Sequence, residues 1–320
     1  MSKKIIYITG CLGLIGSYLT KCCLKKGWYV RGIDKITYAA RPQLLNEFDK
    51  YNNFSFEKND ICNIKTLIDC DYIINTAAET HVDNSIRESE SFLHSNVNGV
   101  YNILEVLRKY KREGSVSPTF IHFSTDEVYG DIIDGEHIET DILKPSNPYS
   151  ATKAAADQLI LAWARTYKIN YVIVRPTNNY GIGQYVEKLI PKSCKYLTLK
   201  RKIPLHNKGT PMRNWLHALD TSEGIIKIIE SGVKNEIYNI SGGFEQSNIV
   251  TVEKIIKEYL GELPTDYKEK YLDFSIQRVG QDVRYALNDD KLRKLGWKPI
   301  CNFDDELKTI IDYHKSTFIW

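Results

Sequence analysis

The sequence predicts an α/β protein built on a doubly wound parallel sheet, with a smaller, irregular second domain. In the first 175 residues, short apolar runs alternate with longer stretches of helical periodicity, which is the pattern of βαβ units. After Arg175-Pro176, glycines and prolines break this alternation. The length of 320 residues suits two domains or one large α/β unit.

Six apolar runs have the length of buried strands, and three stretches between them have the periodicity of helices. Six strands joined in this way fit a doubly wound sheet that is covered on both faces. The expected strands are Ile5–Thr9, Tyr29–Asp34, Phe54–Asn59, Tyr72–Ala77, Thr119–Ser124 and Tyr171–Arg175. The expected helices are Leu14–Lys26, His94–Arg112 and Tyr149–Tyr167.

The second half of the chain has a looser pattern, typical of an irregular ligand-facing region. Its breaks are Gly181, Gly183, Pro191, Pro204, Gly209 and Pro211. We expect a strand at Glu236–Ile240 and amphipathic helices at Thr251–Leu260 and Asp304–His314. Residues 1–176 are expected to form the sheet domain and 177–320 mainly the second, with segments around 213–241 packing back on the first.

Composition and charge exclude several classes of protein. Hydrophobic residues at 42% and charged residues at 26% are typical of a soluble globular chain. The net charge of +3 is too small, and the basic run Lys200–Lys202 too short, for a nucleic-acid binder. No run of 18 apolar residues indicates a membrane span.

The cysteines predict a reducing compartment. They number seven, and no CxxC pair occurs, whereas disulfide frameworks belong to small, secreted chains with an even number of cysteines. We therefore expect free thiols in the cytoplasm. We also expect no metal site, because no group of cysteines and histidines has the spacing of zinc ligands.

A glycine-rich turn follows the first expected strand. Gly10, Gly13 and Gly16 are spaced three apart, and Leu14 and Ile15 begin a helical pattern. Glycine lets the backbone approach a pyrophosphate closely, and the start of the helix offers free N–H groups to the phosphates. A plain strand-to-helix turn has a similar sequence, but the position at the head of a βαβ series favours a dinucleotide site in a Rossmann-like fold.

Asp34 ends the second expected strand. A carboxylate there can bind the ribose hydroxyls of adenosine and repel a 2′-phosphate, although aspartate also caps turns. The combination favours NAD over NADP, even with Arg31 and Lys35 close by. Asp60 and Ile61, at the end of the third expected strand, are a weaker indication of contact with adenine.

Tyr149 and Lys153 stand four residues apart in an alanine-rich helix that begins at Asn147-Pro148. Residues at this spacing share one helical face. A nearby ammonium favours the phenolate, which can take the proton of an alcohol while a hydride leaves the same carbon. Tyrosine and lysine at this spacing are also common on helix surfaces, so the pair gains its meaning from the dinucleotide site upstream.

Asp126 and Glu127 follow Thr125 at the end of the fifth expected strand. Ligands bind at this carboxyl edge of a parallel sheet. Adjacent carboxylates repel each other, which separates their pKa values and allows one acid and one base. A solvated turn is the plain alternative for any Asp-Glu pair, but the place of this one favours catalysis.

Together these motifs resemble the extended short-chain dehydrogenase/reductase superfamily, which acts largely on nucleotide sugars. Thr125-Asp126-Glu127 resembles the nucleotide-diphosphate-glucose 4,6-dehydratases, because epimerases and decarboxylases of the superfamily generally lack the Asp-Glu pair. Further matching segments follow in order almost from end to end: residues 34–39, 77–83, 178–181, 187–191, 213–216, 282–285 and 295–299.

The resemblance implies a hydro-lyase with bound NAD that converts dTDP- or UDP-glucose to the 4-keto-6-deoxy sugar nucleotide, a precursor of rhamnose-type sugars. It implies that Tyr149 takes the C4 hydroxyl proton as hydride passes to NAD, while Lys153 tunes Tyr149 and holds the nicotinamide ribose. Thr125 then bonds the C4 oxygen, Glu127 removes the C5 proton, and Asp126 protonates the departing C6 hydroxyl. The hydride finally returns to C6.

The resemblance also implies the residues that bind cofactor and substrate. Arg213 suits the diphosphate, because a guanidinium binds phosphate oxygens bidentately, and His81 matches a substrate loop. The cofactor residues are Gly10, Gly13, Leu14, Ile15, Gly16, Asp34, Lys35, Thr37, Asp60, Ile61, Ala77, Ala78, Thr80, Asn96, Tyr149, Lys153 and Asn179. The substrate residues are His81, Thr125, Asn178, Lys188, Leu189, Pro204, His206, Arg213, Asn248, Arg278 and Gln281.

Some features depart from the family pattern. Cys11 replaces a usual glycine in the first turn, and Val279-Gly280-Gln281 replaces the usual Pro-Gly-His near the nucleotide. Residues 80–85 and 147–153 also resemble the UDP-glucose dehydratase domains of rhamnose pathways, so the choice between dTDP and UDP stays open, and we expect UDP to be accepted. Alternatives are another nucleotide-sugar epimerase or decarboxylase, or an NAD-binding regulator without turnover.

Members of the family commonly pair two helices across a two-fold axis. These helices match residues 94–112 and 149–167, which carry apolar residues at helical spacing. The resemblance therefore implies a homodimer.

Overall fold

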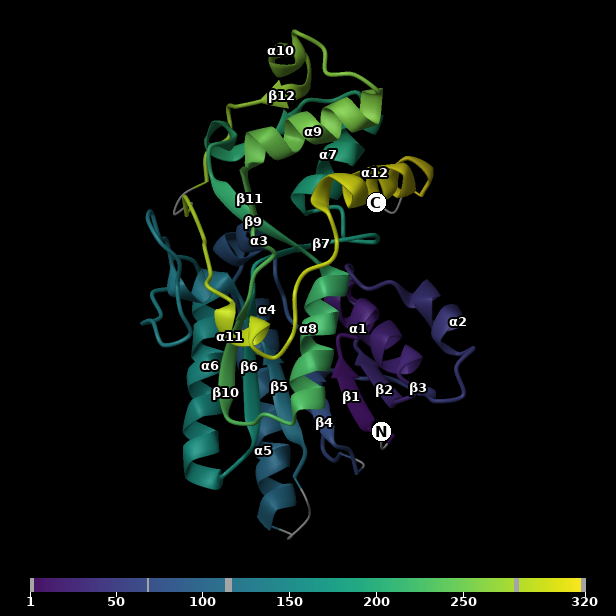
Figure 1. Ribbon diagram of the computed structural model, residues 1–320, viewed down its shortest axis with the longest axis vertical. Helices are drawn as coiled ribbons and strands as arrows, with labels where there is room; N and C mark the ends of the chain where they lie inside the picture. Colours follow the sequence, from purple (N-terminus) through teal and green to yellow (C-terminus); the bar gives the residue numbers. More distant parts are fainter. Residues whose placement is uncertain (1–2, 68, 113–116, 279–281, 318–320) are drawn as a thin grey trace.

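The computed structural model describes residues 3–67, 69–112, 117–278 and 282–317. A large parallel sheet occupies the lower half of Figure 1, and a smaller part lies above it. The sheet has seven strands in the order β10-β6-β5-β4-β1-β2-β3. Its strands are β1 (Ile5–Thr9), β2 (Tyr29–Asp34), β3 (Phe54–Lys58), β4 (Tyr72–Asn75), β5 (Thr119–Phe123), β6 (Tyr171–Pro176) and β10 (Glu236–Ile240). The strand order reverses between β1 and β4, which is where doubly wound sheets bind their ligands.

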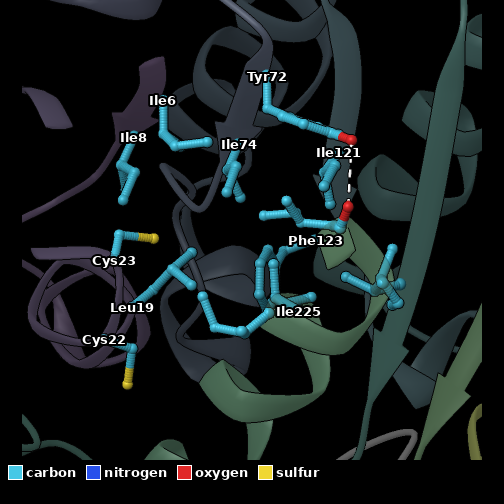
Figure 2. Close-up of a cluster of buried hydrophobic side chains, with 14 of the residues drawn as sticks. Ile6, Ile8, Leu19, Cys22, Cys23, Tyr72, Ile74, Ile121, Phe123 and Ile225 are labelled. Carbon is cyan, nitrogen blue, oxygen red and sulfur yellow. Dashed lines mark hydrogen bonds between the residues drawn. The ribbon is translucent and has the colours of Figure 1, made fainter. Parts of the chain in front are cut away.

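Helices cover both faces of this sheet. The main ones are α1 (Leu14–Lys25), α8 (Ala218–Ser231), α5 (Gly99–Arg112) and α6 (Pro148–Tyr167). Figure 2 shows the layer under α1 and α8, where Leu19 and Ile225 lie in one buried cluster with Ile8 of β1. A second cluster joins α5 and α6 to the opposite face. Each fully buried side chain of this size contributes about 1.5–3 kcal/mol, so both layers hold the sheet.

The smaller part is built around a three-stranded sheet in the order β11-β9-β7 and a two-stranded pair, β12-β8. Trp215 packs against Phe303 with ring centroids 5.6 Å apart, and Tyr180 packs against Phe303 at 5.0 Å. The strands are β7 (Asn178–Tyr180), β8 (Ile203–Pro204), β9 (Met212–His217), β11 (Phe244–Ser247) and β12 (Leu272–Asp273). The larger helices are α7 (Leu189–Thr198), α9 (Asn248–Leu260) and α12 (Phe303–Ser316).

Short helices complete both parts of the chain. They are α2 (Leu45–Phe48), α3 (Val82–Arg87), α4 (Glu90–Phe92), α10 (Tyr267–Tyr271) and α11 (Asp290–Arg293). Among them, α3 and α4 both contact α6. No helix within the described part of the chain is long and apolar enough to cross a bilayer.

The predicted fold class is confirmed, and the six expected strands all occur, each ending within two residues of its expected end. One helix differs. The stretch expected to be a single helix from His94 begins as a π-helical segment, Leu93–Asn98, and becomes α5 at Gly99. A π segment adds a residue to the turn and changes which side chains face the sheet.

The irregular region expected after residue 176 contains helices that the sequence did not predict, of which α7 and α8 are the longest. Pro191 was expected to break the chain, but it lies in the first turn of α7, where its missing N–H removes no helical hydrogen bond. The other, α8, carries buried Ile225, Ile226, Ile228 and Ile229. These isoleucines share one face of the helix, and the less buried Glu223, Lys227 and Glu230 lie on the other.

The chain crosses between the two parts several times. After β6 it enters the smaller part, returns through α8 and β10, which pairs with β6 at the edge of the large sheet, and leaves again. The division into two domains at residue 176 therefore stays a prediction.

Candidate active site

The glycine turn after β1 closes tightly beneath the start of α1. Gly10 has a φ of +70°, and its N–H donates to the carbonyl oxygen of Ile33 at 2.7 Å. A Cβ on Gly16 would lie 2.1 Å from the oxygen of Gly10. Gly13 is the N-cap of α1 and supplies no capping side chain, so the first N–H groups of the helix are left for an anionic ligand.

Gly10→Ala should lower the free energy of unfolding by about 2–5 kcal/mol. About 1–2 kcal/mol comes from the left-handed backbone and about 1–3 from overpacking, because the new Cβ would lie 2.7 Å from the backbone nitrogen of Ala77. Gly232→Ala is the matched control, since Gly232 has the same φ of +70° and no atom within 4 Å of its Cβ position. Urea unfolding of both variants measures the difference; equal losses would contradict the close approach at Gly10.

Two adjoining cavities collect most of the residues expected at the cofactor. The first is lined by Gly10, Gly13, Asp34, Lys35, Thr37, Asp60, Ile61, Ala77 and Ala78. The second is lined by Leu14, Ile15, Gly16, Thr80, Thr125, Tyr149 and Asn179 among others. Asn96 lies behind this wall, where its amide donates to Thr152 Oγ1 at 3.0 Å and accepts from the N–H of Glu79 at 2.9 Å.

Asp34 combines the two roles weighed from the sequence. Its carboxylate accepts from the N–H of Leu12 at 3.1 Å and from that of Ile36 at 2.8 Å, as a turn cap does. It also lines the first cavity, and burial raises its pKa. Each carboxylate oxygen has a second lone pair, so capping leaves acceptors for ribose hydroxyls.

Cys11 fits the turn without entering the cavity. Its side chain is fully buried in the cluster beneath α1, and a Cβ on Gly32 of β2 would lie 2.7 Å from its sulfur. The glycine in β2 therefore makes room for the thiol that stands where the family usually has glycine.

Tyr149 and Lys153 lie on the first turns of α6, but their side chains have different partners. The pKa of the Tyr149 phenol is raised by burial and by the charges of Glu127 and Asp126, and a hydrogen bond with Thr125 opposes the rise. The ammonium of Lys153 donates to the carbonyl oxygen of Phe123 instead. The depression of the phenol pKa by Lys153 that was expected from their spacing is therefore not seen in this structure.

Lys153 is almost completely buried, at 3% exposed. Burial lowers its pKa to about 8, and the charge of Asp157 opposes this fall. Asp157 is in turn bonded to Arg175, with 3.0 Å between Arg175 Nε and Asp157 Oδ2. The lysine therefore titrates close to neutral pH.

Asp126 and Glu127 lie in a single helical turn, Asp126–Tyr129, at the end of β5. Burial raises the pKa of Asp126 to about 7, and the charge of Glu127 adds to the rise. Thr125 Oγ1 donates to Asp126 Oδ1 at 3.0 Å, while the buried Oδ2 has no hydrogen-bond partner. An aspartate in this state can hold a proton at neutral pH and offer it to a ligand.

Glu127 has partners that favour its charged form. Burial raises its pKa, but a hydrogen bond from Asn147 and the charges of Arg213 and Lys188 lower it. Asn147 Nδ2 donates to Glu127 Oε2 at 3.1 Å, and its Oδ1 caps α6 by accepting from Ser150 N–H at 2.9 Å. The capping residue, whose catalytic position the sequence did not reveal, thus ties the acidic turn to the helix of Tyr149.

The residues expected at the substrate line two further cavities next to the acidic turn. Asn178, Lys188, Leu189, Arg213 and Arg278 line both, and His81 does also. Pro204, His206 and Asn248 line one of them. Gln281, with Val279 and Gly280, lies outside the described residues. Lys188, Arg213 and Arg278 give these cavities cationic groups of the kind that bind phosphate oxygens, beside the acidic side chains of Glu127 and Glu187.

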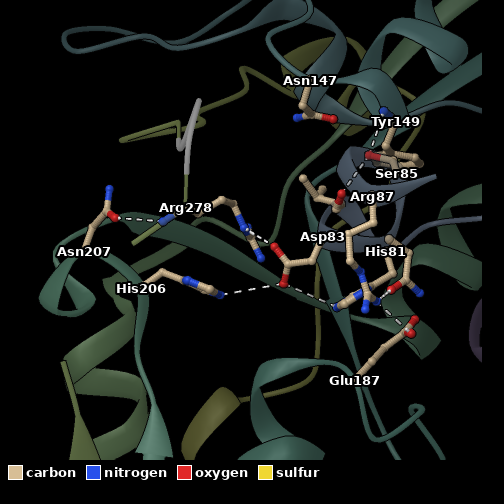
Figure 3. Close-up of polar contacts among 12 residues, drawn as sticks. His81, Asp83, Ser85, Arg87, Asn147, Tyr149, Glu187, His206, Asn207 and Arg278 are labelled. Carbon is tan, nitrogen blue, oxygen red and sulfur yellow. Dashed lines mark hydrogen bonds and ion pairs between the residues drawn. The ribbon is translucent and has the colours of Figure 1, made fainter. Parts of the chain in front are cut away.

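Asp83 was not among the expected residues, although it ends a segment that carries the resemblance. Figure 3 shows it between Arg278 and His206, with 2.6 Å to Arg278 Nε and 3.6 Å to His206 Nε2. Although burial raises its pKa, hydrogen bonds from these two residues hold the pKa of Asp83 well below its usual range. Asp83 thereby joins α3 to the wall of the smaller part.

One group of metal-ligating side chains also forms at the rim of the first cavity. Asp60, Cys62 and His94 place their ligand atoms within 4.8 Å of one another, a grouping not apparent from the sequence spacing. Lys35 Nζ lies 3.7 Å from Asp60 Oδ2, so a cation already occupies one side of the carboxylate.

The chain matches known proteins over nearly its whole length. The family model described as GDP-mannose 4,6 dehydratase matches residues 7–310. A dTDP-glucose 4,6-dehydratase of Haemophilus influenzae is 35% identical over 97% of this chain and 97% of its own. A dTDP-glucose 4,6-dehydratase of Streptomyces venezuelae, crystallised with NAD, is 32% identical, has a TM-score of 0.87, and matches over 98% and 97% of the two chains.

An epimerase shares the fold at lower identity. The UDP-glucuronic acid 4-epimerase of Bacillus cereus has a TM-score of 0.88 over 98% of this chain and 99% of its own, at 23% identity. That likeness concerns the fold alone. The resemblance inferred from the motifs is confirmed: the chain belongs to the GDP-mannose 4,6 dehydratase family of extended short-chain dehydrogenases/reductases, together with the dTDP-glucose 4,6-dehydratases.

Proposed function

We propose that this protein is an NAD-dependent hydro-lyase that converts dTDP-glucose to its 4-keto-6-deoxy derivative. The observation that carries the proposal is the pair formed by Asp126, with a raised pKa and a buried oxygen that has no hydrogen bond, and Glu127, whose rise in pKa on burial is opposed by Asn147 and by the charge of Arg213. Both line the substrate side of the cavity that reaches the glycine turn. Relatives of the same length that are about one-third identical are named for this reaction.

The cofactor cavity fits NAD. The glycine turn leaves N–H groups for a pyrophosphate, and Asp34 offers acceptors to ribose hydroxyls while its charge disfavours a 2′-phosphate. When bound, NAD takes a hydride from the sugar and later returns it. The residues that would hold it are those of the two adjoining cavities, and solved relatives contain NAD.

In the oxidation, Tyr149 serves as base for the C4 hydroxyl. Thr125 lies between the phenol and Asp126 and can bond the C4 oxygen as it becomes a carbonyl. Lys153 stands one turn further along the same helix and brings a positive charge to the site, which favours the phenolate that forms during proton transfer.

In the elimination, the two carboxyl groups have opposite roles. The C4 ketone acidifies the C5 proton, and Glu127, held charged by Asn147, takes it. Asp126 donates its proton to the departing C6 hydroxyl, which leaves as water. Protonation of C5 then restores Glu127. At this point Tyr149 holds the C4 hydroxyl proton and Asp126 has lost one to the departing water, so transfer of one proton from the phenol to Asp126 through solvent returns both groups to their starting states.

The preference for thymine or uracil as the nucleotide base is a further part of the proposal. Incubation with dTDP-glucose and with UDP-glucose, without added reductant, should give a 4-keto-6-deoxy product from dTDP-glucose, and comparison of kcat/KM for the two measures the preference. We expect UDP-glucose to be accepted as well. A rhamnose-type pathway is part of the proposal, and no 6-deoxy product from either nucleotide would end it.

Two alternative functions predict different outcomes of the same incubation. An epimerase or decarboxylase would return a hexose changed at C4 or a pentose, and the presence of both Asp126 and Glu127 disfavours it. A regulator without turnover would be expected to lack one of the five catalytic groups. All five are present: Thr125, Asp126, Glu127, Tyr149 and Lys153.

A homodimer in the cytoplasm is also part of the proposal. On the outer faces of α5 and α6, Tyr101 is 47% exposed and packs edge-on against Trp163 with ring centroids 5.9 Å apart. Apolar surface of this kind favours pairing of the two helices with a second copy. Light scattering should give twice the chain mass of 36.9 kDa; a single-chain mass at micromolar concentration would contradict it.

A further inference from the structure

A row of buried polar side chains crosses the large sheet directly beneath the site. Thr9 of β1 pairs with Asn75 of β4, and Asn75 pairs with His122 of β5. All three are at most 1% exposed, and the proposed mechanism uses none of them. Buried polar groups are retained at a cost in stability unless they are bonded, so their partners are informative.

The row is continuous and ends at Lys153. Thr9 Oγ1 donates to Asn75 Oδ1 at 2.6 Å, and Asn75 Nδ2 lies 3.2 Å from His122 Nδ1. His122 Nε2 lies 3.5 Å from Lys153 Nζ. The imidazole is therefore the only link of this row that touches the lysine.

In this arrangement the hydrogen bonds fit a neutral amine. If His122 Nδ1 accepts from Asn75, a neutral imidazole carries its proton on Nε2 and directs it at Lys153. An ammonium has only donors, so it cannot accept that proton. An uncharged Lys153 can.

A second arrangement fits the ammonium equally well. Lys153 then donates to His122 Nε2, His122 Nδ1–H donates to Asn75 Oδ1 after a rotation of the amide, and Asn75 Nδ2 donates to the Thr9 hydroxyl oxygen. Lys153, His122 and Asn75 are again bonded, and the Thr9 hydroxyl accepts where it donated before. Between the two arrangements one proton has left Lys153, while the imidazole keeps one proton on the other nitrogen.

We propose that His122 is a positioning residue for Lys153: a neutral imidazole whose tautomer follows the charge of the lysine and holds the side chain in place in both states. The proposal for His122 rests on the proposed function only because that function assigns Lys153 a part in C4 oxidation. The row also connects Lys153 to the glycine turn, because Gly10 follows Thr9 directly along the chain.

The surroundings favour a neutral imidazole. Burial and the charge of Lys153 hold the pKa of His122 well below its ordinary value. Lys153 is faced by His122 on β5 and by Asp157 on its own helix, and Arg175 on β6 pairs with Asp157. Tyr149 is the remaining titratable group on that face of α6. His122 therefore stays uncharged while Lys153 gains or loses its proton.

Nuclear magnetic resonance of the full chain labelled with ¹⁵N-histidine tests the tautomer without any substrate. We expect the unprotonated nitrogen of His122 to be Nε2 below about pH 8 and Nδ1 above it, with assignment from the signal lost in His122→Gln. Lys153→Met should abolish the change. An imidazolium signal, or one tautomer across the whole range, would overturn the proposal.

Kinetics test the positioning role. The background is Asp126→Asn, in which only C4 oxidation is followed, so that ionisation of Asp126 does not enter the pH profile. Adding His122→Phe should move the alkaline limb of NADH formation down by about one pH unit and slow it about fivefold at pH 8, with KM unchanged. His122→Gln should restore much of the rate, because its amide oxygen can replace Nε2 as acceptor.

The control is His314→Phe, the same change at a half-buried histidine of α12. It should leave the pH profile unchanged. An unmoved alkaline limb in folded His122→Phe protein would refute the role in positioning. Failure of the wild type to turn over any glucose nucleotide would instead refute the proposed function, and the tautomer measurement would still decide the present inference.

Discussion

Asp126→Asn should stop the reaction after the first hydride transfer. The variant keeps the size and the Thr125 hydrogen bond of the side chain but has no proton to give to the C6 hydroxyl, and a general acid contributes about 10²–10⁴-fold to rate. Product formation should fall by this factor, while C4 oxidation proceeds and NADH accumulates in a single turnover. The NADH absorbance after mixing with dTDP-glucose is the measurement.

The same variant has a second readout in stability. Because the folded pKa of Asp126 is about 7 against an ordinary value of 3.8, the native state binds a proton that the unfolded chain loses between these values. Its contribution is therefore present at pH 4 and is lost as pH rises through 7. Asp126→Asn should melt at a higher temperature than the wild type at pH 8, and at a similar one at pH 4.

Asp134→Asn, a change at an exposed aspartate a few residues along the chain, is the matched control and should alter neither readout. Equal loss of oxidation and dehydration in Asp126→Asn would contradict the assignment of Asp126 as the acid.

Tyr149→Phe should abolish the oxidation itself. Phenylalanine preserves the edge-on contact with Phe92, whose ring centroid lies 6.3 Å away, but it cannot take the C4 proton. We expect a fall in kcat of about 10²–10⁴-fold with no accumulated NADH, in contrast to Asp126→Asn. Single-turnover absorbance and binding of NAD, which should be retained, separate lost chemistry from lost cofactor.

The control for this change is Tyr101→Phe, which removes a hydroxyl from an exposed ring of α5. Its activity should equal that of the wild type. NADH formation by Tyr149→Phe at an undiminished rate would show that another group accepts the C4 proton.

The parallel sheet could be predicted from the sequence because each of its strands is a short, apolar run between turn residues. Its edge strand was expected as a strand, but its partner was not determined, since nothing local to Glu236–Ile240 specifies pairing with β6. Helix α8 was not predicted, although the sequence contains its signal: Glu223, Lys227 and Glu230 stand at helical spacing among the buried isoleucines.

The residues of the candidate site also differ in how far they could be predicted from the sequence. Residues whose chemistry follows from neighbours in the chain, such as Thr125, Asp126 and Glu127, could be singled out by sequence and motif. The positions of Asn147 and Asp83 could not, because their partners are distant in sequence: Asn147 bonds Glu127, and Asp83 bonds Arg278. The inward direction of Lys153 also depends on the strand packed beneath it, which helix spacing cannot reveal.

The late return of the chain to the sheet bears on how the protein is made. Strand β6 ends at Pro176, and its neighbour β10 begins only at Glu236. While a ribosome synthesises the intervening segment, the backbone groups along that side of β6 have no pairing partner, and exposed edges of this kind invite association between nascent chains. Chaperone dependence during translation should therefore be greatest in that interval and end once α8 and β10 have emerged.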